Sequence, residues 1–215
     1  DGVNWFALTS TTAVPQAGTT GACNYPTTAT ALYQFSSDAT DTCGNYNGTN
    51  DSGIVYTTPG KFGNGAQFGG GSDRIDIDQA LLGSGTTKIW STSFWFNTSS
   101  ATEQYMNNTA AYSSGKGYSV YIRSNGYLQF STSDGGGGNS EKGWRYEVAT
   151  VNDGNWHNVV ATYSSAGGTN DAYLYLYLDG VDVTSASTAI NSMVNGSGPT
   201  YSSFTTPRIS LGNWA

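Results

Sequence analysis

Groups that could carry out catalysis are few in this sequence. His157 is the only histidine, so any dyad or triad that uses imidazole would depend on it alone. It follows Trp156 in a predicted strand, and we interpret it as a packing residue. Asp76 and Asp78 alternate along another predicted strand and could present a carboxylate pair, but a solvated strand face is the preferred interpretation. We therefore expect a protein that is not an enzyme.

Side chains that carry oxygen cluster between residues 38 and 51. Carboxylate and amide oxygens at such close spacing are the ligands from which Ca²⁺ sites are built. Asp and Asn also favour turns, and the residues alone leave both interpretations open. The candidate Ca²⁺ ligands are Asp38, Asp41, Asn45, Asn47 and Asp51, and no other cofactor is expected.

Aromatic rings supply the second kind of recognition chemistry. A ring can stack on the C–H face of a sugar while neighbouring Asn, Asp and Ser side chains bond the hydroxyls. One set of candidate rings lies near a predicted hairpin and a glycine-rich tip, and a second set alternates with leucines along one predicted strand. The candidate carbohydrate-binding residues are Tyr118, Tyr121, Trp144 and Tyr146 in the first set, and Tyr173, Tyr175 and Tyr177 in the second. The same rings could instead cover an outer sheet face or pack against a neighbouring protomer.

Composition excludes two classes of partner. Eight Lys and Arg against fifteen Asp and Glu give a formal net charge of −7, which disfavours binding to a phosphate backbone. No apolar run approaches the ~20 residues of a membrane-spanning helix. We therefore expect neither nucleic-acid binding nor membrane insertion.

Strands separated by Gly and Asn turns must position these residues. Residues 153–163 and 172–180 are the predicted central pair, and strict alternation places Leu174, Leu176 and Leu178 inward with the tyrosines opposite. About ten short strands predict two packed antiparallel sheets. Besides the central pair, the expected strands cover residues 31–35, 61–68, 73–77, 90–96, 117–123, 127–130, 143–150 and 207–212. Residues 1–21 read as a strand and linker that end a preceding unit, and residues 22–215 as the main domain.

Five stretches, in order, resemble the concanavalin A-like, laminin-G-type jelly-roll family. They are Leu-Tyr-Gln-Phe at 32–35, Gly-Lys-Phe-Gly-Asn-Gly-Ala-Gln-Phe at 60–68, Ser-Phe-Trp-Phe at 93–96, Asp-Gly-Asn-Trp-His-Asn-Val at 153–159 and Leu-Tyr-Leu-Asp-Gly at 176–180. The resemblance covers residues 30 to 212. It implies an all-β, two-sheet antiparallel jelly-roll sandwich of the lectin/glucanase type, with a structural His at position 157 and often Ca²⁺ at the sheet rim. It also implies a further strand after residue 212; without one, a sheet edge could be open to another chain.

Glucanases of the same fold carry two Glu and one Asp on one strand. Glu103, Glu141 and Glu147 have no matching neighbour, so the resemblance does not extend to that activity.

Within the family, Cys-Asn-Tyr-Pro at 23–26 and Asp-Thr-Cys-Gly at 41–44 are similar to versions in tail and structural proteins of aquatic phages, including cyanophages. This resemblance implies a non-catalytic module of a virion tail or fibre, at the particle surface or otherwise extracellular. Its expected partners are host surface glycans or other virion proteins, and we expect a homo-oligomer. The alternatives are a glycoside hydrolase or polysaccharide lyase of this fold, and a calcium-dependent cell-surface adhesion domain.

The two cysteines, Cys23 and Cys43, allow two interpretations. They could form a disulfide that ties the entry of the first predicted strand to the loop after it, or remain two buried thiols. The choice depends on the compartment.

Overall fold

Alternating apolar and polar residues fold this chain into antiparallel strands. The structure is a computed structural model. It describes residues 3–5, 29–50, 53–71, 73–78, 89–109, 116–134, 141–165, 172–191 and 208–212. No helix occurs among these residues, and every pair of neighbouring strands is antiparallel. The predicted all-β class is confirmed.

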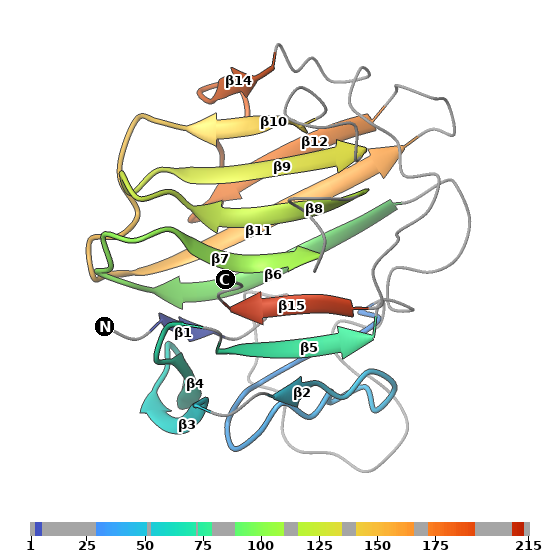
Figure 1. Cartoon of the computed structure of the whole chain (residues 1–215), viewed down its shortest axis with the longest axis vertical. Helices are drawn as coiled ribbons and strands as arrows, with labels where there is room; N and C mark the ends of the chain where they lie inside the picture. Colours follow the sequence, from blue (N-terminus) through green and yellow to red (C-terminus); the bar gives the residue numbers. More distant parts are fainter. Residues whose placement is uncertain are drawn as a thin grey trace.

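An eight-stranded sheet forms one layer of the molecule (Figure 1). Its strands, in spatial order, are β14 (Thr188–Ile190), β10 (Glu141–Tyr146), β9 (Leu128–Asp134), β8 (Lys116–Ile122), β7 (Gln104–Thr109), β15 (Arg208–Gly212), β5 (Arg74–Asp78) and β2 (Thr49–Asn50). The neighbours β7 and β15 are about a hundred residues apart in the chain. Their pairing is what joins the two halves of the sheet.

The opposite layer contains a four-stranded and a three-stranded sheet. The four-stranded sheet runs β13 (Val181–Asp182), β12 (Ala172–Leu178), β11 (Trp156–Ser165) and β6 (Ile89–Asn97). The three-stranded sheet runs β1 (Val3–Trp5), β4 (Asn64–Phe68) and β3 (Val55–Pro59). In Figure 1 the long strands β6, β11 and β12 cross those of the eight-stranded sheet. The two layers make the predicted sandwich.

The core lies between the two layers. Leu174, Leu176 and Leu178 of β12 are buried in it together with Phe130 of β9, as the alternation predicted. Trp144 of β10 also reaches across the sandwich, where its indole Nε1 donates to the Leu174 carbonyl oxygen at 2.9 Å. Burial of apolar area and this hydrogen bond therefore hold the eight-stranded sheet to the four-stranded one.

Tight turns occur where the sequence predicts them. The β8–β9 hairpin turns at residues 124–126, and Gly126 has a φ of +84°. A side chain there would be strained, and its Cβ would also collide with the Asn152 side chain. The β12–β13 turn uses two residues of positive φ, Asp179 at +51° and Gly180 at +81°. Positive φ at both central residues is the geometry that matches the twist of a two-residue hairpin.

Residues 31–35 do not form the predicted strand. Tyr33 makes only an isolated bridge to Asp41. The Asp41 carboxylate takes the Leu32 N–H, at 2.8 Å, so this donor is not available to a neighbouring strand. Phe35 adopts a φ of +52°, which ends any extended conformation. The apolar side chains of this segment still enter the core.

Two predicted strand bounds are adjusted by the structure. Residues 61–63 form the turn before β4, and β10 ends at Tyr146 instead of continuing to residue 150. β15 lies between β7 and β5, so both of its edges are paired. β1 pairs with residues 66–68 of β4, which ties residues 3–5 to the main domain. Residues 6–28 lie outside the described part, and the boundary at residue 21 stays a prediction.

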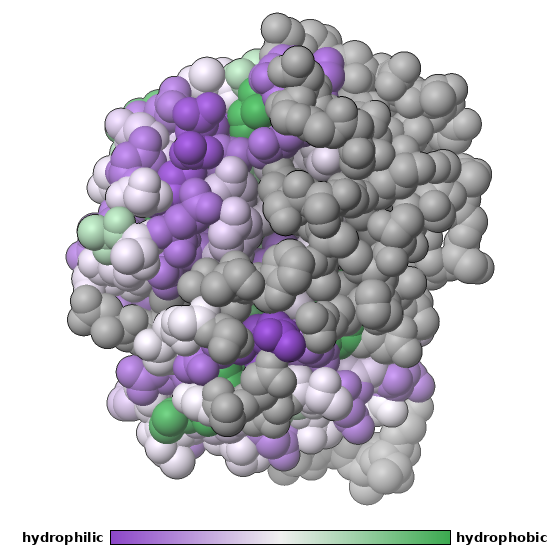
Figure 2. Space-filling model, in the orientation of Figure 1, coloured by the Kyte–Doolittle hydropathy of each residue, from purple (hydrophilic) through white to green (hydrophobic). Residues whose placement is uncertain are grey.

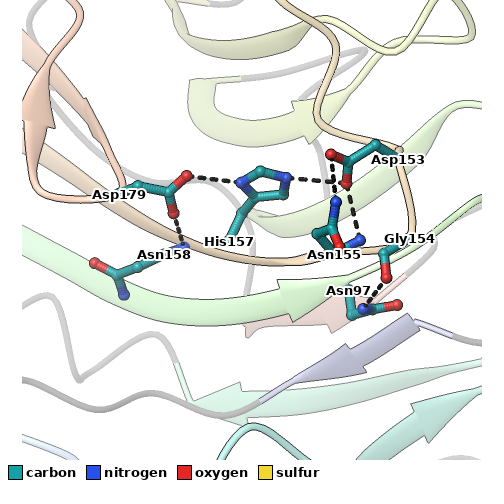
Figure 3. A network of polar contacts seen from close by, with 7 residues as sticks. All are labelled: Asn97, Asp153, Gly154, Asn155, His157, Asn158 and Asp179. Carbon is teal, nitrogen blue, oxygen red and sulfur yellow. Dashed lines mark hydrogen bonds and ion pairs between the residues drawn. The ribbon is translucent and has the colours of Figure 1, made fainter.

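A polar network closes one end of the four-stranded sheet (Figure 3). His157 Nδ1 lies 2.7 Å from Asp179 Oδ2, and His157 Nε2 lies 3.2 Å from Asp153 Oδ1. The other Asp179 oxygen accepts the Asn158 N–H at 2.7 Å. Donors on the side chain and backbone of Asn155, and to a lesser degree His157, lower the pKa of Asp153. His157 thus joins the loop before β11 to the β12–β13 turn and packs against Phe96; its structural role stays a prediction.

Substitutions at Asp179 separate its two contacts. We expect Asp179→Ala to lower the free energy of unfolding by about 2 kcal/mol, because the turn loses the bonds to Asn158 and His157. Asp179→Asn retains an acceptor oxygen and a residue type that tolerates positive φ, so it should cost below about 1 kcal/mol. Urea unfolding of the two variants measures both values. Equal losses of unfolding free energy in the two variants would show that the charge of Asp179, and not its hydrogen bond to Asn158, provides the stabilisation.

Adjacent substitutions in β12 test the assignment of its faces. Leu176→Ala opens a cavity in the core and should cost about 2–5 kcal/mol. Tyr175→Ser, one residue away on the outer face, should cost roughly 1 kcal/mol or less. Equilibrium unfolding in urea gives both losses, and a reversed order would contradict the register.

Candidate functional site

The loop around Asp41 is organised by one buried carboxylate. Asp41 is 1 % exposed. Its Oδ1 accepts the backbone N–H groups of Leu32 and Cys43, at 2.8 and 2.9 Å. Its Oδ2 accepts those of Asn45 and Tyr46, both at 3.1 Å. Each oxygen therefore already holds two backbone donors, and the carboxylate acts as the cap of the loop.

The other candidate calcium ligands are spread around this cap. Asp38 accepts the Thr40 N–H at 2.8 Å, and this bond lowers the pKa of Asp38. Asn47 Oδ1 accepts the Asp41 N–H at 3.0 Å, and Asn45 is exposed. Asp51 lies outside the described residues. In the described part of the chain, no three His, Cys, Asp or Glu residues are grouped as metal ligands, and calcium binding by this loop stays a prediction.

Cys43 follows the cap and is disulfide-bonded. Cys23, the other cysteine of the chain, lies outside the described residues. The pairing of the two stays a prediction.

The first set of predicted sugar-binding rings serves mainly to pack the fold. Tyr118 is a core residue and not an open platform: it is 2 % exposed, it packs against Trp90, and its hydroxyl donates to Asn107 Oδ1 at 2.7 Å. Burial raises its pKa well above the ordinary value. Trp144 and Tyr146 are half-buried against the core. Alternation along a strand could not reveal this, because it does not say which sheet face is covered.

Tyr121 lies on the other face of β8. It is buried and stacks on Tyr105, with ring centroids 5.0 Å apart. Burial raises the pKa of both phenols, and the Glu141 carboxylate adds to the rise for each of them. Tyr121 is therefore packed, but outside the main core.

The second set of rings lies together on the outer face of the four-stranded sheet. Tyr173 and Tyr175 are 38 % and 37 % exposed, and Tyr177 is half-exposed. Each of the three tyrosines pairs with a residue of β11, and that residue pairs on its other side with a residue of β6. We call these nine positions the Tyr face: Tyr173, Ser164 and Ile89; Tyr175, Thr162 and Ser91; Tyr177, Val160 and Ser93. None of the nine is charged.

The hydroxyl side chains of the Tyr face were missed by sequence reasoning. Ser91, Thr162 and Ser164 come from strands far apart in the chain. Only the register of β6, β11 and β12 brings them beside the tyrosines. Their spacing in the sequence does not indicate that they lie on one face.

Carboxylates in the described part of the chain do not form a catalytic pair. Asp76 accepts from Arg74 Nε at 3.1 Å and from Ser210 Oγ at 2.9 Å. The Asp78 side chain lies outside the described part. The glutamates are on separate elements: Glu103 precedes β7, Glu141 begins β10 and Glu147 follows it. The described residues thus offer no matched acid and nucleophile on one strand.

The described surface is mainly hydrophilic in the view of Figure 2, where apolar residues form small separate patches. The described part of the chain contains no helix long and apolar enough to span a bilayer.

Substitution of Asp41 tests the cap. Asp41→Ala leaves four backbone donors without their charged acceptor and should lower the free energy of unfolding by about 3 kcal/mol or more. The control, Asp38→Ala, removes one exposed bond and should cost about 1 kcal/mol or less. Thermal unfolding in chelator measures both without calcium. If the Asp41 loss were as small as that of Asp38, the cap would not be structural.

Comparison with solved structures supports the architecture. The binding domain of botulinum neurotoxin DC, in complex with rat synaptotagmin II, is 16% identical over 82% of this chain and 41% of that chain, with a TM-score of 0.51. The same binding domain in complex with SialylT is 14% identical over 81% of this chain and 41% of that chain, with a TM-score of 0.48. This chain thus spans less than half of theirs, and the likeness concerns the fold. No curated protein matches the chain.

A family model described as "Concanavalin A-like lectin/glucanases superfamily", of the laminin G type, matches residues 68–206. This match begins at the end of β4 and includes β5–β14. The chain belongs to this laminin G-type family of concanavalin A-like jelly rolls.

Proposed function

We propose that this chain is a non-catalytic recognition module that binds glycans through the Tyr face. The observation that carries the proposal is the exposure of Tyr173 and Tyr175 side by side on one sheet face, among nine positions that carry no charge. Exposed aromatic rings aligned on a rigid strand offer a platform for the C–H face of a sugar. The neighbouring hydroxyls of Thr162 and Ser164 can bond sugar hydroxyls without a charge on either partner.

The size of the Tyr face favours a small ligand. Three strands about 4.8 Å apart and three rows about 6.7 Å apart give a grid of roughly 10 by 13 Å. A stable protein interface buries about 800 Å² on each partner, several times this area. An oligosaccharide fits the grid better than a protein partner does.

The arrangement of carboxylates supports a binding role over catalysis. Glycoside hydrolysis in this fold needs two carboxyl groups that face one sugar. Asp76, the described member of the predicted pair, is already bonded to Arg74 and Ser210. A polysaccharide hydrolase or lyase is therefore not the function we propose.

The proposed setting is the surface of a virion, in a tail or fibre, with host glycans as the ligand and other virion proteins or further copies of this chain as neighbours. This part of the proposal is motivated by the similarity of residues 23–26 and 41–44 to phage tail and structural proteins. Immunogold labelling of purified particles would test it, and absence of the chain from particles would contradict it.

A glycan array of neutral and acidic oligosaccharides tests the recognition role. We expect binding, and we expect Tyr175→Ser to lower the affinity for the bound glycan about tenfold or more, which corresponds to about 1.4 kcal/mol. Tyr175→Phe keeps the ring and should retain most of the affinity.

The matched control is Tyr127→Ser, which makes the same change next to the β8–β9 turn and should leave the affinity unchanged. Equal affinities for Tyr175→Ser and the unsubstituted chain would exclude the Tyr face, and an array without any binding would overturn the glycan proposal itself.

A further inference from the structure

The turn between β3 and β4 holds a lysine and a phenylalanine against an indole of the four-stranded sheet. Lys61 and Phe62 lie between Pro59, the last residue of β3, and Asn64, the first residue of β4. Lys61 Nζ lies 4.6 Å from the centroid of the Trp95 ring. The Phe62 ring meets the same indole edge to face, with ring centroids 5.8 Å apart. We call Lys61, Phe62 and Trp95 the Trp95 corner.

Trp95 belongs to the same sheet face as the tyrosines of the Tyr face. Phe94 and Phe96, on either side of it, are core residues, so alternation places Trp95 on the outer face of β6. Trp95 comes two residues after Ser93 of the Tyr face and pairs with Asn158 of β11. This pair forms the next row of the face, about 6.7 Å further along the strands. The Trp95 corner therefore extends the Tyr face by one row.

The Lys61 ammonium has capacity for a further partner. Lys61 and Phe62 are both exposed, Phe62 at 49 %. Lys61 forms no ion pair and donates no hydrogen bond within the described part of the chain, whereas Arg74 and Arg145 each pair with a carboxylate. An ammonium has three N–H donors, and its attraction to the indole ring does not supply an acceptor oxygen. Lys61 can therefore bond an acceptor of a ligand.

The surroundings hold this charge in place. The Gly60 N–H donates to the Gly63 carbonyl oxygen at 2.7 Å, which closes the turn. The side-chain amide of Asn64 donates to the Ser36 carbonyl oxygen at 3.1 Å. The indole attracts the ammonium and so restricts the lysine side chain. A cation that is already positioned loses less conformational entropy when a ligand binds.

Negative charges of the protein act on this corner only from a distance. The Asp179 carboxylate lies beyond Asn158 on the same row, about two strand spacings, or about 10 Å, from Trp95. It is bonded to the Asn158 N–H and to His157. Salt screens exposed charges beyond about 8 Å at physiological ionic strength, and this weakens the repulsion by the net charge of −7. The positive charge of Lys61 is the one that a ligand bonded to Nζ meets directly.

We infer that the glycan bound by the Tyr face is acidic. Lys61 bonds the carboxylate or sulfate of one sugar unit, and the exposed ring of Phe62 packs against that unit. The rest of the glycan lies on the uncharged positions of the Tyr face. Charge-assisted hydrogen bonds are stronger than neutral ones, so the corner selects acidic glycans over neutral ones. This inference rests on the glycan-binding role proposed for the Tyr face and adds the class of the glycan.

Paired oligosaccharides test the inference. The probes are oligogalacturonate with its methyl ester, and a sulfated galactan oligosaccharide with its desulfated form. We expect the anionic member of at least one pair to bind about tenfold more tightly than its neutral counterpart, and the two pairs distinguish a carboxylate from a sulfate. Lys61→Met keeps the apolar stem without the charge. It should abolish this preference and leave the affinity for the neutral member unchanged, whereas Lys61→Arg should restore most of the preference.

The matched control is Lys142→Met, the same substitution in β10 of the eight-stranded sheet, which should leave both affinities unchanged. The Tm of Lys61→Met should stay within about 2 °C of the unsubstituted chain, because Lys61 is exposed.

Tyr175→Ser separates this inference from the proposed function, since it should weaken binding of both members of a pair. If Tyr175→Ser weakens binding of a glycan for which neither its charge nor Lys61 matters, the Tyr face stands and the inference is overturned. It is also overturned if neither pair binds, or if the preference for the anion persists in Lys61→Met. A glycan array without any binding would overturn both.

Discussion

The pairing of β11 with β12 is the constraint on which the rest of the structure depends. Each leucine of β12 that enters the core places the tyrosine next to it on the outer face, because the side chains of a strand alternate strictly. A slip of one residue would exchange the two sets. The core and the Tyr face are therefore two consequences of one register, set by Val159 opposite Leu178 and Ala161 opposite Leu176. A substitution that alters the register changes the core and the Tyr face together.

Carboxylates that accept backbone N–H groups hold the loops, where no alternation of apolar and polar residues sets the conformation. Asp41 accepts four backbone donors, and Asp179 accepts one donor while it contacts His157. These contacts explain why residues 31–35 have the composition of a strand and yet do not form one. The nearest acceptor for Leu32 N–H is a side chain, not a neighbouring strand. The same contacts show how a cluster of Asp and Asn can resemble a metal site in sequence and serve as a turn scaffold in structure.

Strands whose pattern is local were predictable, and those that depend on distant partners were not. β6, β11, β12 and the β8–β9 hairpin follow from alternation and from turn residues such as Gly126. β7 was not predicted, since its consecutive polar residues Asn107 and Asn108 and its bulge hide the alternation. The order of the sheet, with β15 between β7 and β5, is set by contacts across about a hundred residues.

The candidate sites show the same division. The stripe of three tyrosines is visible in the sequence because it lies on one strand. The burial of Tyr118 was not visible, because it depends on which sheet covers that face.

The Tyr face and the pair Asn108 and Ser119 differ in what they cost the folded chain. The Tyr face leaves aromatic area in water. The chain forgoes the stabilisation that burial of this area would give, but no backbone or side-chain strain is involved. Asn108 and Ser119 bury amide and hydroxyl atoms that have no hydrogen-bond partner in the described part of the protein, which is unfavourable for the fold. The contrast with Asp41 is instructive, because there the same chain supplies every carboxylate oxygen with two donors. The fold therefore treats two buried polar groups differently: Asp41 is fully bonded and maintains structure, whereas Asn108 is left unbonded at a cost in stability.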